Sequence, residues 1–271
     1  MTSSVEGTGT FFAPFSLGSR ELVSLVGGGG KTTLLQALGE HLRRRGTVLL
    51  TTTTKMAPGP LPLLFVEEAT LTEGAARIRA ALSGPDHPLI LAAQRPIWDG
   101  DREKLEGFSP EAVDRLWEAG AADFLICEAD GARRKPLKAW ADWEPPVPSQ
   151  TTLLCAVLGA DRLDEPLTDE HVHRMALMTE RFGLRPGDTL TPERLAALLE
   201  SPLGYLKNAP PAGRRLVLLN RSDRLAPPRL DALTHGFLPR LARALRSWDL
   251  LILGSLHRRR PEAVLPLERV R

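Results

Sequence analysis

The sequence predicts an α/β fold in which a mostly parallel β-sheet of about seven strands lies between two layers of helices. Three observations support this fold. Short, unbroken hydrophobic runs alternate with longer segments of helical periodicity, as expected for strands that are buried on both faces of a parallel sheet. The first run leads into a glycine-rich loop followed by a helix, and the fourth run ends in two acidic residues.

The predicted elements follow one another in regular order. Strands are expected at residues 22–26, 48–53, 89–93, 124–127, 153–158, 216–219 and 250–253, and helices at residues 32–45, 74–82, 110–119, 169–182, 192–199 and 229–246. The first helix has the clearest local signals, because Leu34, Leu38 and Leu42 form an apolar stripe and Gly46 follows as a C-terminal cap. The next strand begins directly after this glycine, which predicts a βαβ unit.

The expected organisation is a single domain of residues 20–271 behind a flexible leader of residues 1–19. The leader lacks the charged and apolar regions of a secretion signal. Residues 161–206 contain two of the predicted helices between consecutive strands, so we expect a small helical insertion there.

Composition narrows the classes of partner. The chain of 271 residues has a formal net charge of +2, which gives no reason to expect binding to nucleic acid. It contains no apolar stretch of about 18 residues, so no membrane span is expected. Cys127 and Cys155 lie in apolar runs without the spacing of metal ligands, and we expect reduced thiols in the core of a cytoplasmic protein.

The glycine-rich loop carries the strongest functional signal. Glycines let the backbone approach phosphate oxygens, the lysine would reach the β- and γ-phosphates, and the first threonine hydroxyl would bind Mg²⁺. The loop is a shortened form that resembles the loop of the Mur ligases, because Leu25 stands where the standard pattern has glycine. It predicts a three-layer P-loop NTPase fold, with Lys31 as a catalytic residue. The nucleotide-binding residues expected here are Gly27, Gly28, Gly29, Gly30, Lys31, Thr32 and Thr33.

Polar residues follow two further strands at the same predicted edge of the sheet, where ligands of α/β proteins bind. Thr53 is expected to contact magnesium together with Thr32, and Lys55 to sense the γ-phosphate. Glu128 and Asp130 are candidate catalytic residues that would hold magnesium or orient the attacking water, with Glu128 as a metal ligand. The alternatives are a threonine-rich strand and a surface turn without function.

Several motifs, taken together and in order, resemble the YqeC-like family. Its members are described as accessory proteins of selenium-dependent molybdenum hydroxylases. The resemblance implies a P-loop fold and a role in the maturation of a molybdenum hydroxylase, whereas nothing in the residues themselves indicates selenium chemistry. The motifs are Val-Gly-Gly-Gly-Gly-Lys-Thr-Thr at residues 26–33, Thr-Thr-Thr-Thr-Lys at 51–55, Lys-Leu-Glu-Gly-Phe at 104–108, Glu-Ala-Asp-Gly-Ala-Arg at 128–133, Pro-Leu-Lys at 136–138 and Glu-Pro at 144–145.

A basic loop follows the acidic strand end. Arg133 and Lys138 are expected to contact a second anionic group, either a phosphate or a phosphorylated or pterin-like substrate, through charge-assisted hydrogen bonds. The alternative is a solvated charged loop.

The last nucleotide-binding motif follows the sixth predicted strand. Asn220 and Asp223 resemble the Asn-Lys-x-Asp motif, with Arg221 in place of lysine. The Asp223 carboxylate would accept hydrogen bonds from guanine N1–H and the exocyclic amine, which adenine does not offer in that arrangement. GTP is therefore favoured over ATP, although Asn-x-x-Asp is also a common turn.

The leading functional hypothesis is a Mg²⁺-dependent nucleoside triphosphatase that acts as an accessory factor for a molybdenum hydroxylase or its cofactor. The alternatives are a small-molecule kinase, a Mur-like ATP-dependent ligase, or a nucleotide-binding scaffold without catalysis. A homodimer is a further expectation, by analogy with other P-loop proteins.

Overall fold

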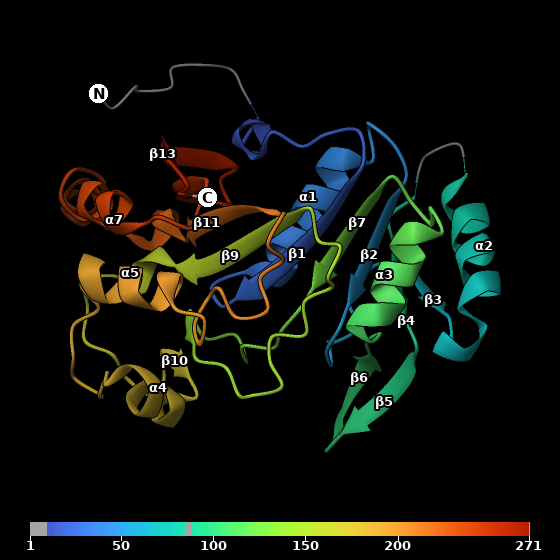
Figure 1. Ribbon diagram of the computed structural model, residues 1–271, viewed down its shortest axis with the longest axis horizontal. Coiled ribbons are helices and arrows are strands. Elements are labelled where there is room, and N and C mark those ends of the chain that lie inside the picture. The colour runs from blue at the N-terminus through green and yellow to red at the C-terminus, as the bar shows by residue number, and fades with distance from the viewer. Residues whose placement is uncertain (1–9, 85–87, 271) are drawn as a thin grey trace.

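The computed structural model describes residues 10–84 and 88–270, and its centre is one nine-stranded sheet in the order β13-β12-β11-β9-β1-β7-β2-β4-β3 (Figure 1). All neighbouring strands are parallel except β12 and β13, which form an antiparallel pair. The predicted α/β fold with a mostly parallel sheet and helices on both sides is therefore confirmed.

The elements have the following bounds. The strands of the main sheet are β1 (Glu21–Gly27), β2 (Val48–Thr52), β3 (Leu63–Phe65), β4 (Ile90–Ala93), β7 (Phe124–Glu128), β9 (Leu153–Gly159), β11 (Arg214–Asn220), β12 (Leu250–Ser255) and β13 (Arg260–Pro266). Two small sheets add β5 (Arg95–Asp99) with β6 (Arg102–Glu106), and β8 (Leu137–Lys138) with β10 (Val172–His173). The helices are α1 (Lys31–Leu42), α2 (Leu71–Leu82), α3 (Pro110–Glu118), α4 (Met175–Phe182), α5 (Pro192–Glu200), α6 (Pro227–Ala232) and α7 (Leu238–Ala244).

The core lies on both faces of this sheet. Because successive side chains of a strand point to opposite faces, β1 directs Val23 and Leu25 toward α1, and Leu22 and Val26 toward the opposite layer. In that opposite layer, α2 and α3 cover the half of the sheet that contains β2 and β7, and α5 and α7 cover the half that contains β9, β11 and β12 (Figure 1). β1 is thus buried on both sides, which explains its unbroken hydrophobic run.

The sheet has two more strands than the sequence predicts, and both lie at its edges. β3 and β13 consist mainly of exposed or half-buried residues, so they lack the continuous hydrophobic run that marks the inner strands. The helix expected at residues 169–182 begins only at Met175, because Val172–His173 pair with Leu137–Lys138 as strands. The helix expected at residues 229–246 consists of α6, a π-helix (Leu233–Phe237) and α7.

Part of the expected leader belongs to the fold. Phe11, Phe12 and Phe15 are buried in the same apolar cluster as α1, and Ala13–Phe15 form a short 3-10 helix. The expectation of a flexible segment is therefore wrong for residues 10–19, whereas residues 1–9 lie outside the described residues. The three aromatic side chains explain the difference, since their burial stabilises an ordered segment.

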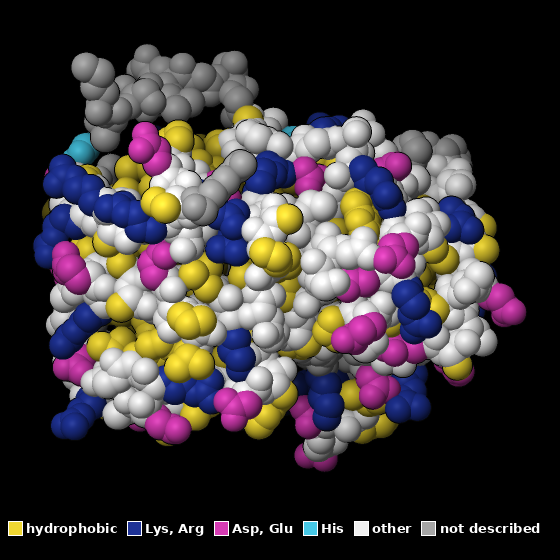
Figure 2. All heavy atoms as spheres, in the orientation of Figure 1, with side chains coloured by type: hydrophobic (Ala, Val, Ile, Leu, Met, Phe, Trp, Pro, Cys, Tyr) yellow, Lys and Arg dark blue, Asp and Glu magenta, His cyan; other side chains and the backbone are white. Residues whose placement is uncertain are grey.

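Two properties of the molecule as a whole bear on its partners. In the described part of the chain, no helix is both long and apolar enough to cross a membrane. Figure 2 shows basic and acidic side chains interspersed over one face of the molecule, in keeping with a net charge of +2.

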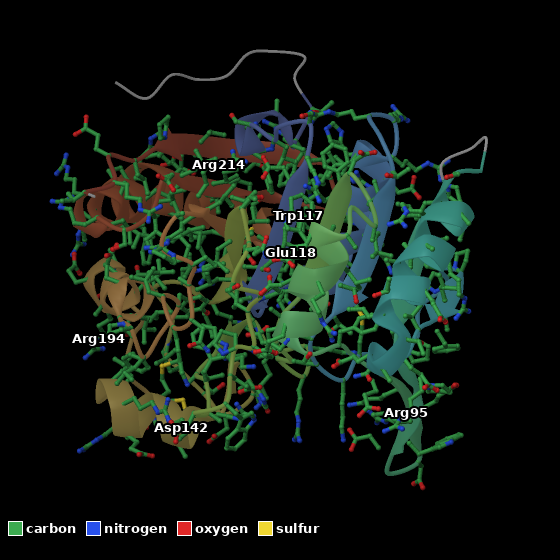
Figure 3. All side chains as sticks on the ribbon, turned by 45° about the vertical axis from the view of Figure 1, so that its right-hand side comes forward. Arg95, Trp117, Glu118, Asp142, Arg194 and Arg214 are labelled. Carbon is green, nitrogen blue, oxygen red and sulfur yellow. The ribbon has the colours of Figure 1, made fainter. Side chains whose placement is uncertain are left out.

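The strand order brings the predicted site together at one edge of the sheet. β1 lies between β9 and β7, and β2 lies beside β7, so the residues that follow these parallel strands share their carboxyl edge. The β5–β6 hairpin and the β10–α4 segment lie on either side of this edge, in the lower part of Figure 1. Figure 3 labels Arg95 on the hairpin and Asp142 beside α4, which mark these two sides.

Candidate functional site

The glycine loop connects β1 directly to α1. The strand extends through Gly27 and the helix begins at Lys31, which confirms that Leu25 belongs to the strand and that the loop is short. Gly30 has a φ angle of 126°, which strongly favours glycine, and no side chain caps the helix. Among the described residues, the backbone N–H groups of Lys31, Thr32 and Thr33 have no acceptor. The first turn of α1 therefore offers several donors and the positive end of the helix dipole.

The two central glycines, Gly28 and Gly29, connect the loop to neighbouring segments through backbone hydrogen bonds. The Gly28 N–H donates to the Val157 carbonyl at 2.8 Å, and the Gly29 N–H donates to the Lys135 carbonyl at 3.2 Å. A Cβ atom on Gly28 would lie 2.4 Å from the Lys135 carbonyl oxygen, so no other residue fits there without displacing that segment. The donors that remain for an anion therefore come from the first turn of α1.

Lys31 is the centre of the polar contacts. The residue is only 5% exposed. Its ammonium group donates to the Gly27 carbonyl at 2.5 Å and lies 3.0 Å from Asp130 Oδ1 and 3.7 Å from Glu128 Oε1. Burial alone would lower the pKa of Lys31, but the negative charges of Asp130 and Glu128 outweigh it and raise this pKa. Lys31 is thus held in its charged form.

Glu128 and Thr32 form the open side of this cluster. The Thr32 hydroxyl donates to Glu128 Oε2 at 2.8 Å, and the Thr32 side chain faces solvent. Burial raises the pKa of Glu128 above its ordinary value in spite of the nearby Lys31 charge. The sequence-predicted partners from the glycine loop and from the end of β7 are therefore in direct contact.

Asp130 lies behind Lys31 and is completely buried. Oδ2 accepts hydrogen bonds from the Gly27 N–H at 2.9 Å and from Trp140 Nε1 at 2.7 Å. Although burial raises the pKa of Asp130, the positive charges of Lys31 and Lys138 and the Gly27 N–H lower it below its ordinary value. Asp130 is thus an ionised counter-charge that positions the loop and its lysine.

Lys138 is buried, whereas the sequence places it on a basic loop that contacts an anionic group. It is 1% exposed, lies 3.4 Å from Asp130 Oδ2 and 3.0 Å from Glu144 Oε1, and donates to the Gly131 carbonyl. Burial lowers the pKa of Lys138 to about 8. Glu144 also pairs with Arg174, so a chain of alternating charges runs from the glycine loop to the start of α4. Lys138 therefore acts inside the protein, because β8 carries it into the core.

Three other predicted residues make no contact with this charge cluster among the hydrogen bonds and ion pairs of the described residues. The Thr53 hydroxyl donates to the Pro146 carbonyl at 2.7 Å, so this side chain points toward the loop after β8. Lys55 and Arg133 are exposed, and neither has a hydrogen-bond or ion-pair partner in the described part of the chain. The pKa of Asp99 on the β5–β6 hairpin is lowered mainly by its hydrogen bond and ion pair with Lys104, and to a smaller extent by the positive charges of Lys55 and Arg133.

Asn220 and Asp223 lie on the other side of the loop, at the end of β11. Asn220 Nδ2 donates to the Gly29 carbonyl at 2.7 Å, and Asn220 Oδ1 accepts from the Leu256 N–H at 3.0 Å. Asn220 therefore joins the glycine loop to the segment after β12. Asp223 Oδ1 accepts from the Ser255 hydroxyl at 2.6 Å, and its side chain is partly exposed. The structure thus brings this motif to the glycine loop.

Two residues of the site have no signal in the sequence. Trp140 donates to Asp130, and its ring meets Tyr205 edge-on with ring centroids 4.4 Å apart. Tyr205 in turn lies against Gly27, since a Cβ atom there would approach the tyrosine ring to 2.9 Å. Trp140 belongs to no local motif, and Tyr205 reaches the loop from 178 positions further along the chain, so only the fold identifies them.

Comparison with known proteins agrees with the motif pattern. The family model described as "YqeC protein" matches residues 23–176, a segment that contains the glycine loop, Glu128, Asp130 and Lys138. A protein of Escherichia coli (strain K12) that bears the name "Uncharacterized protein YqeC" is 36% identical over 203 residues, which cover 74% of this chain and 75% of that protein. The chain therefore belongs to the YqeC family.

Proposed function

We propose that this protein binds a nucleoside triphosphate with Mg²⁺ at the glycine loop and hydrolyses it. One observation carries the proposal: Lys31 and the Thr32 hydroxyl, both in the first turn of α1, contact the carboxylates that follow the neighbouring strand β7. In P-loop proteins a lysine at an uncapped helix N-terminus binds the phosphates, and a hydroxyl next to that lysine binds magnesium with the help of a nearby carboxylate.

The residues divide between the phosphates and the metal. Lys31 would exchange part of its contacts for oxygens of the β- and γ-phosphates, which also receive hydrogen bonds from the first turn of α1. Thr32 and Glu128 would bind Mg²⁺. Among the described residues, no group of three or more His, Cys, Asp or Glu is arranged to hold a metal, so phosphate oxygens and water would supply the other ligands.

Hydrolysis needs a water molecule that attacks the γ-phosphorus in line with the leaving oxygen. The new P–O bond forms from this water while the bond to the β–γ bridging oxygen breaks, which leaves a nucleoside diphosphate and inorganic phosphate. Glu128 is also the candidate for orienting the attacking water, because it contacts the Thr32 hydroxyl on the open side of the cluster. The proton of this water would pass to an oxygen of the departing phosphate. Asp130 would position Lys31, since its own oxygens are already used within the protein.

The base would lie beside Asp223, with GTP favoured over ATP. Ser255 donates to one carboxylate oxygen of Asp223 and so fixes its orientation. The other oxygen would accept a hydrogen bond from the guanine edge, whereas adenine would leave this acceptor unpaired.

The biological role that we propose follows the family resemblance: a cytoplasmic, nucleotide-controlled accessory factor for a molybdenum hydroxylase or its cofactor. The bound nucleotide would control contact with this client, and a homodimer is part of the proposal by analogy with other P-loop proteins. Phosphoryl transfer to a small molecule is a second candidate function, because Lys55 and Arg133 follow strands β2 and β7 as exposed cations that would be available to an anionic acceptor.

The test is a thermal-shift panel of ATP, GTP, CTP and their diphosphates with and without Mg²⁺, followed by an assay of phosphate release. A bound nucleotide raises the melting temperature by mass action. We expect a Mg²⁺-dependent shift that is largest for GTP, slow phosphate release, and loss of both in Lys31→Ala. Arg44→Ala is the matched control, because Arg44 is an exposed cation beyond the other end of α1. If no nucleotide shifts the melting temperature of the wild type, the proposal is wrong.

A further inference from the structure

Asp161 is a buried carboxylate at the carboxyl edge of the sheet, and the proposed reaction does not use it. The residue is 9% exposed and follows β9, in the short 3-10 helix Ala160–Arg162. Its Oδ1 atom is buried and accepts no hydrogen bond from the described residues. Because a buried carboxylate costs free energy unless an opposite charge compensates it, the cations around Asp161 indicate what it does.

The neighbouring strand supplies the cation that faces this atom. β9 and β11 are parallel, and their register pairs Gly159 with Asn220 at the ends of the two strands. The residues that follow meet at the same edge, where Arg221 Nη1 lies 3.6 Å from Asp161 Oδ1. Both side chains are largely buried, with 17% of Arg221 and 10% of Asp161 exposed. An ion pair in such a place is screened little by salt and holds the guanidinium in position.

The other oxygen of Asp161 faces different arginines. Arg162 Nε and Arg224 Nη1 lie 3.7 Å and 3.8 Å from Oδ2, and 38% and 60% of their side chains are exposed. Ion pairs with such solvated side chains contribute little to stability. The Asp161 backbone carbonyl accepts from Arg229 Nη2 at 3.4 Å, which ties this turn to α6. Arg221 is therefore the one of these arginines that Asp161 holds on its buried side.

Gly159 places this ion pair next to the glycine loop. A Cβ atom on Gly159 would lie 2.6 Å from Asp161 Oδ1 and 3.4 Å from Arg221 Nη1. A Cβ atom on Gly29 would in turn lie 2.4 Å from the Gly159 nitrogen, so the loop packs directly on this strand end. The Arg221 guanidinium thus lies one residue away from the loop, and Asp223 follows two positions later in the chain.

The base of a bound nucleotide needs a flat surface in this region. Trp140 and Tyr205, the aromatic residues beside the loop, are buried against each other and cannot stack on a base from solution. A guanidinium is planar, stacks on aromatic rings and forms an ion pair at its edge at the same time. Arg221 meets both requirements, because Asp161 contacts only one of its nitrogens within the ion-pair distance.

We propose that Asp161 is a positioning residue of the nucleotide site, which holds the Arg221 guanidinium where it stacks against the base. This inference rests on the proposed function, since it needs a nucleotide at the glycine loop. Arg221 contributes affinity for purine nucleotides in general, because every base has an aromatic face. The discrimination between guanine and adenine stays with Asp223.

The test measures the binding of GTP, ATP and tripolyphosphate, each with Mg²⁺, by isothermal titration calorimetry. Tripolyphosphate offers the phosphates without a base. Arg221→Ala should bind both nucleotides about tenfold more weakly, the loss of one stacking interaction, and should bind tripolyphosphate as the wild type does. Alanine adds no backbone strain at the φ angle of 73°, because arginine has the same Cβ atom. Arg224→Ala is the matched control, since it removes an exposed arginine from the same carboxylate, and it should bind all three ligands normally.

A double-mutant cycle tests the role of Asp161. Asp161→Asn keeps the size of the side chain and removes its charge, and it should bind both nucleotides about threefold more weakly while binding tripolyphosphate normally. This loss should disappear in the Arg221→Ala background, because Asp161 acts through that arginine. A merely structural role would instead give the same loss in both backgrounds and would extend to tripolyphosphate.

The outcomes separate this inference from the proposed function. If the wild type binds no nucleotide, both are wrong. If the wild type binds nucleotides but Arg221→Ala binds them as tightly as Arg224→Ala does, only the inference is overturned. Independent, additive effects of Asp161→Asn and Arg221→Ala would exclude Asp161 as a positioning residue.

Discussion

The buried carboxylate of Asp130 is the contact on which the geometry of the site depends most. It neutralises Lys31 at 3.0 Å and Lys138 at 3.4 Å, and it accepts hydrogen bonds from Gly27 and Trp140. Asp130→Asn keeps the size of the side chain and one acceptor oxygen, so no cavity is created. It removes the negative charge, and two buried ammonium groups then share the remaining carboxylates.

The magnitude follows from the burial of these groups. Removing one partner of a buried ion pair leaves an uncompensated charge and typically costs about 3–5 kcal/mol. Lys138 can relieve part of this cost by releasing its proton, because burial has already lowered its pKa to about 8. We therefore expect a loss of about 3 kcal/mol in unfolding free energy near neutral pH. In a chain of this size that corresponds to a decrease in Tm of roughly 6–12 °C.

The pH dependence gives the sharper test. The pKa of Lys138 lies below its ordinary value of 10.5 in the folded protein, so the unfolded chain binds more protons between the two values. Without Asp130 the charged form of Lys138 is less favourable still. The stability difference between wild type and Asp130→Asn should therefore be largest on the acidic side of neutrality and shrink as the pH rises through 8, where a neutral lysine no longer needs a counter-charge.

Urea denaturation of both proteins across this pH range measures the difference directly. Asp142→Asn is the matched control, since Asp142 pairs with Arg181 but its side chain is 89% exposed, and its replacement should leave stability unchanged. The reasoning is refuted if Asp130→Asn is as stable as Asp142→Asn near neutral pH, or if its loss of stability grows as the pH is raised.

Three further outcomes are expected. Gly28→Ala should lose about 1–3 kcal/mol of stability and the ability to bind nucleotide, since its Cβ would lie 2.4 Å from the Lys135 carbonyl. Gly131→Ala is the control, because a Cβ there meets nothing within 4 Å, and it should behave as the wild type in melting and binding assays. Asp223→Asn should abolish the preference for GTP over ATP but keep phosphate binding, which competition binding measures; an unchanged preference would exclude Asp223 from base recognition. The pKa of His173 is lowered to about 4 in the folded protein, so its contribution to stability is present above its ordinary pKa of 6.5 and is lost as the pH falls toward 4. In His173→Gln the melting temperature should therefore depend less on pH over that interval.

Much of the fold could be predicted from local pattern. The inner strands of the sheet are buried on both faces, so their sequences are continuous hydrophobic runs that stand out along the chain. The edge strands β3 and β13 and the β5–β6 hairpin have exposed residues and no such run. Their pairing depends on which strand lies next to them, which the local sequence does not encode. The burial of Phe11 and Phe15 against α1 is likewise a tertiary contact.

The sequence by itself determined the chemistry of the site: a short glycine loop, a lysine and threonine at a helix start, and carboxylates at the end of a buried strand. Only the tertiary structure decided which groups face the solvent. Lys138 and Asp130 are buried partners, whereas Arg133 lies outside at the rim. The physical reason is that β8 pairs with β10 and so carries Lys138 into the core, a contact between segments 35 positions apart in the chain. The residue type determines that Lys138 is a base, but the fold determines the burial and the neighbouring charges that change its pKa.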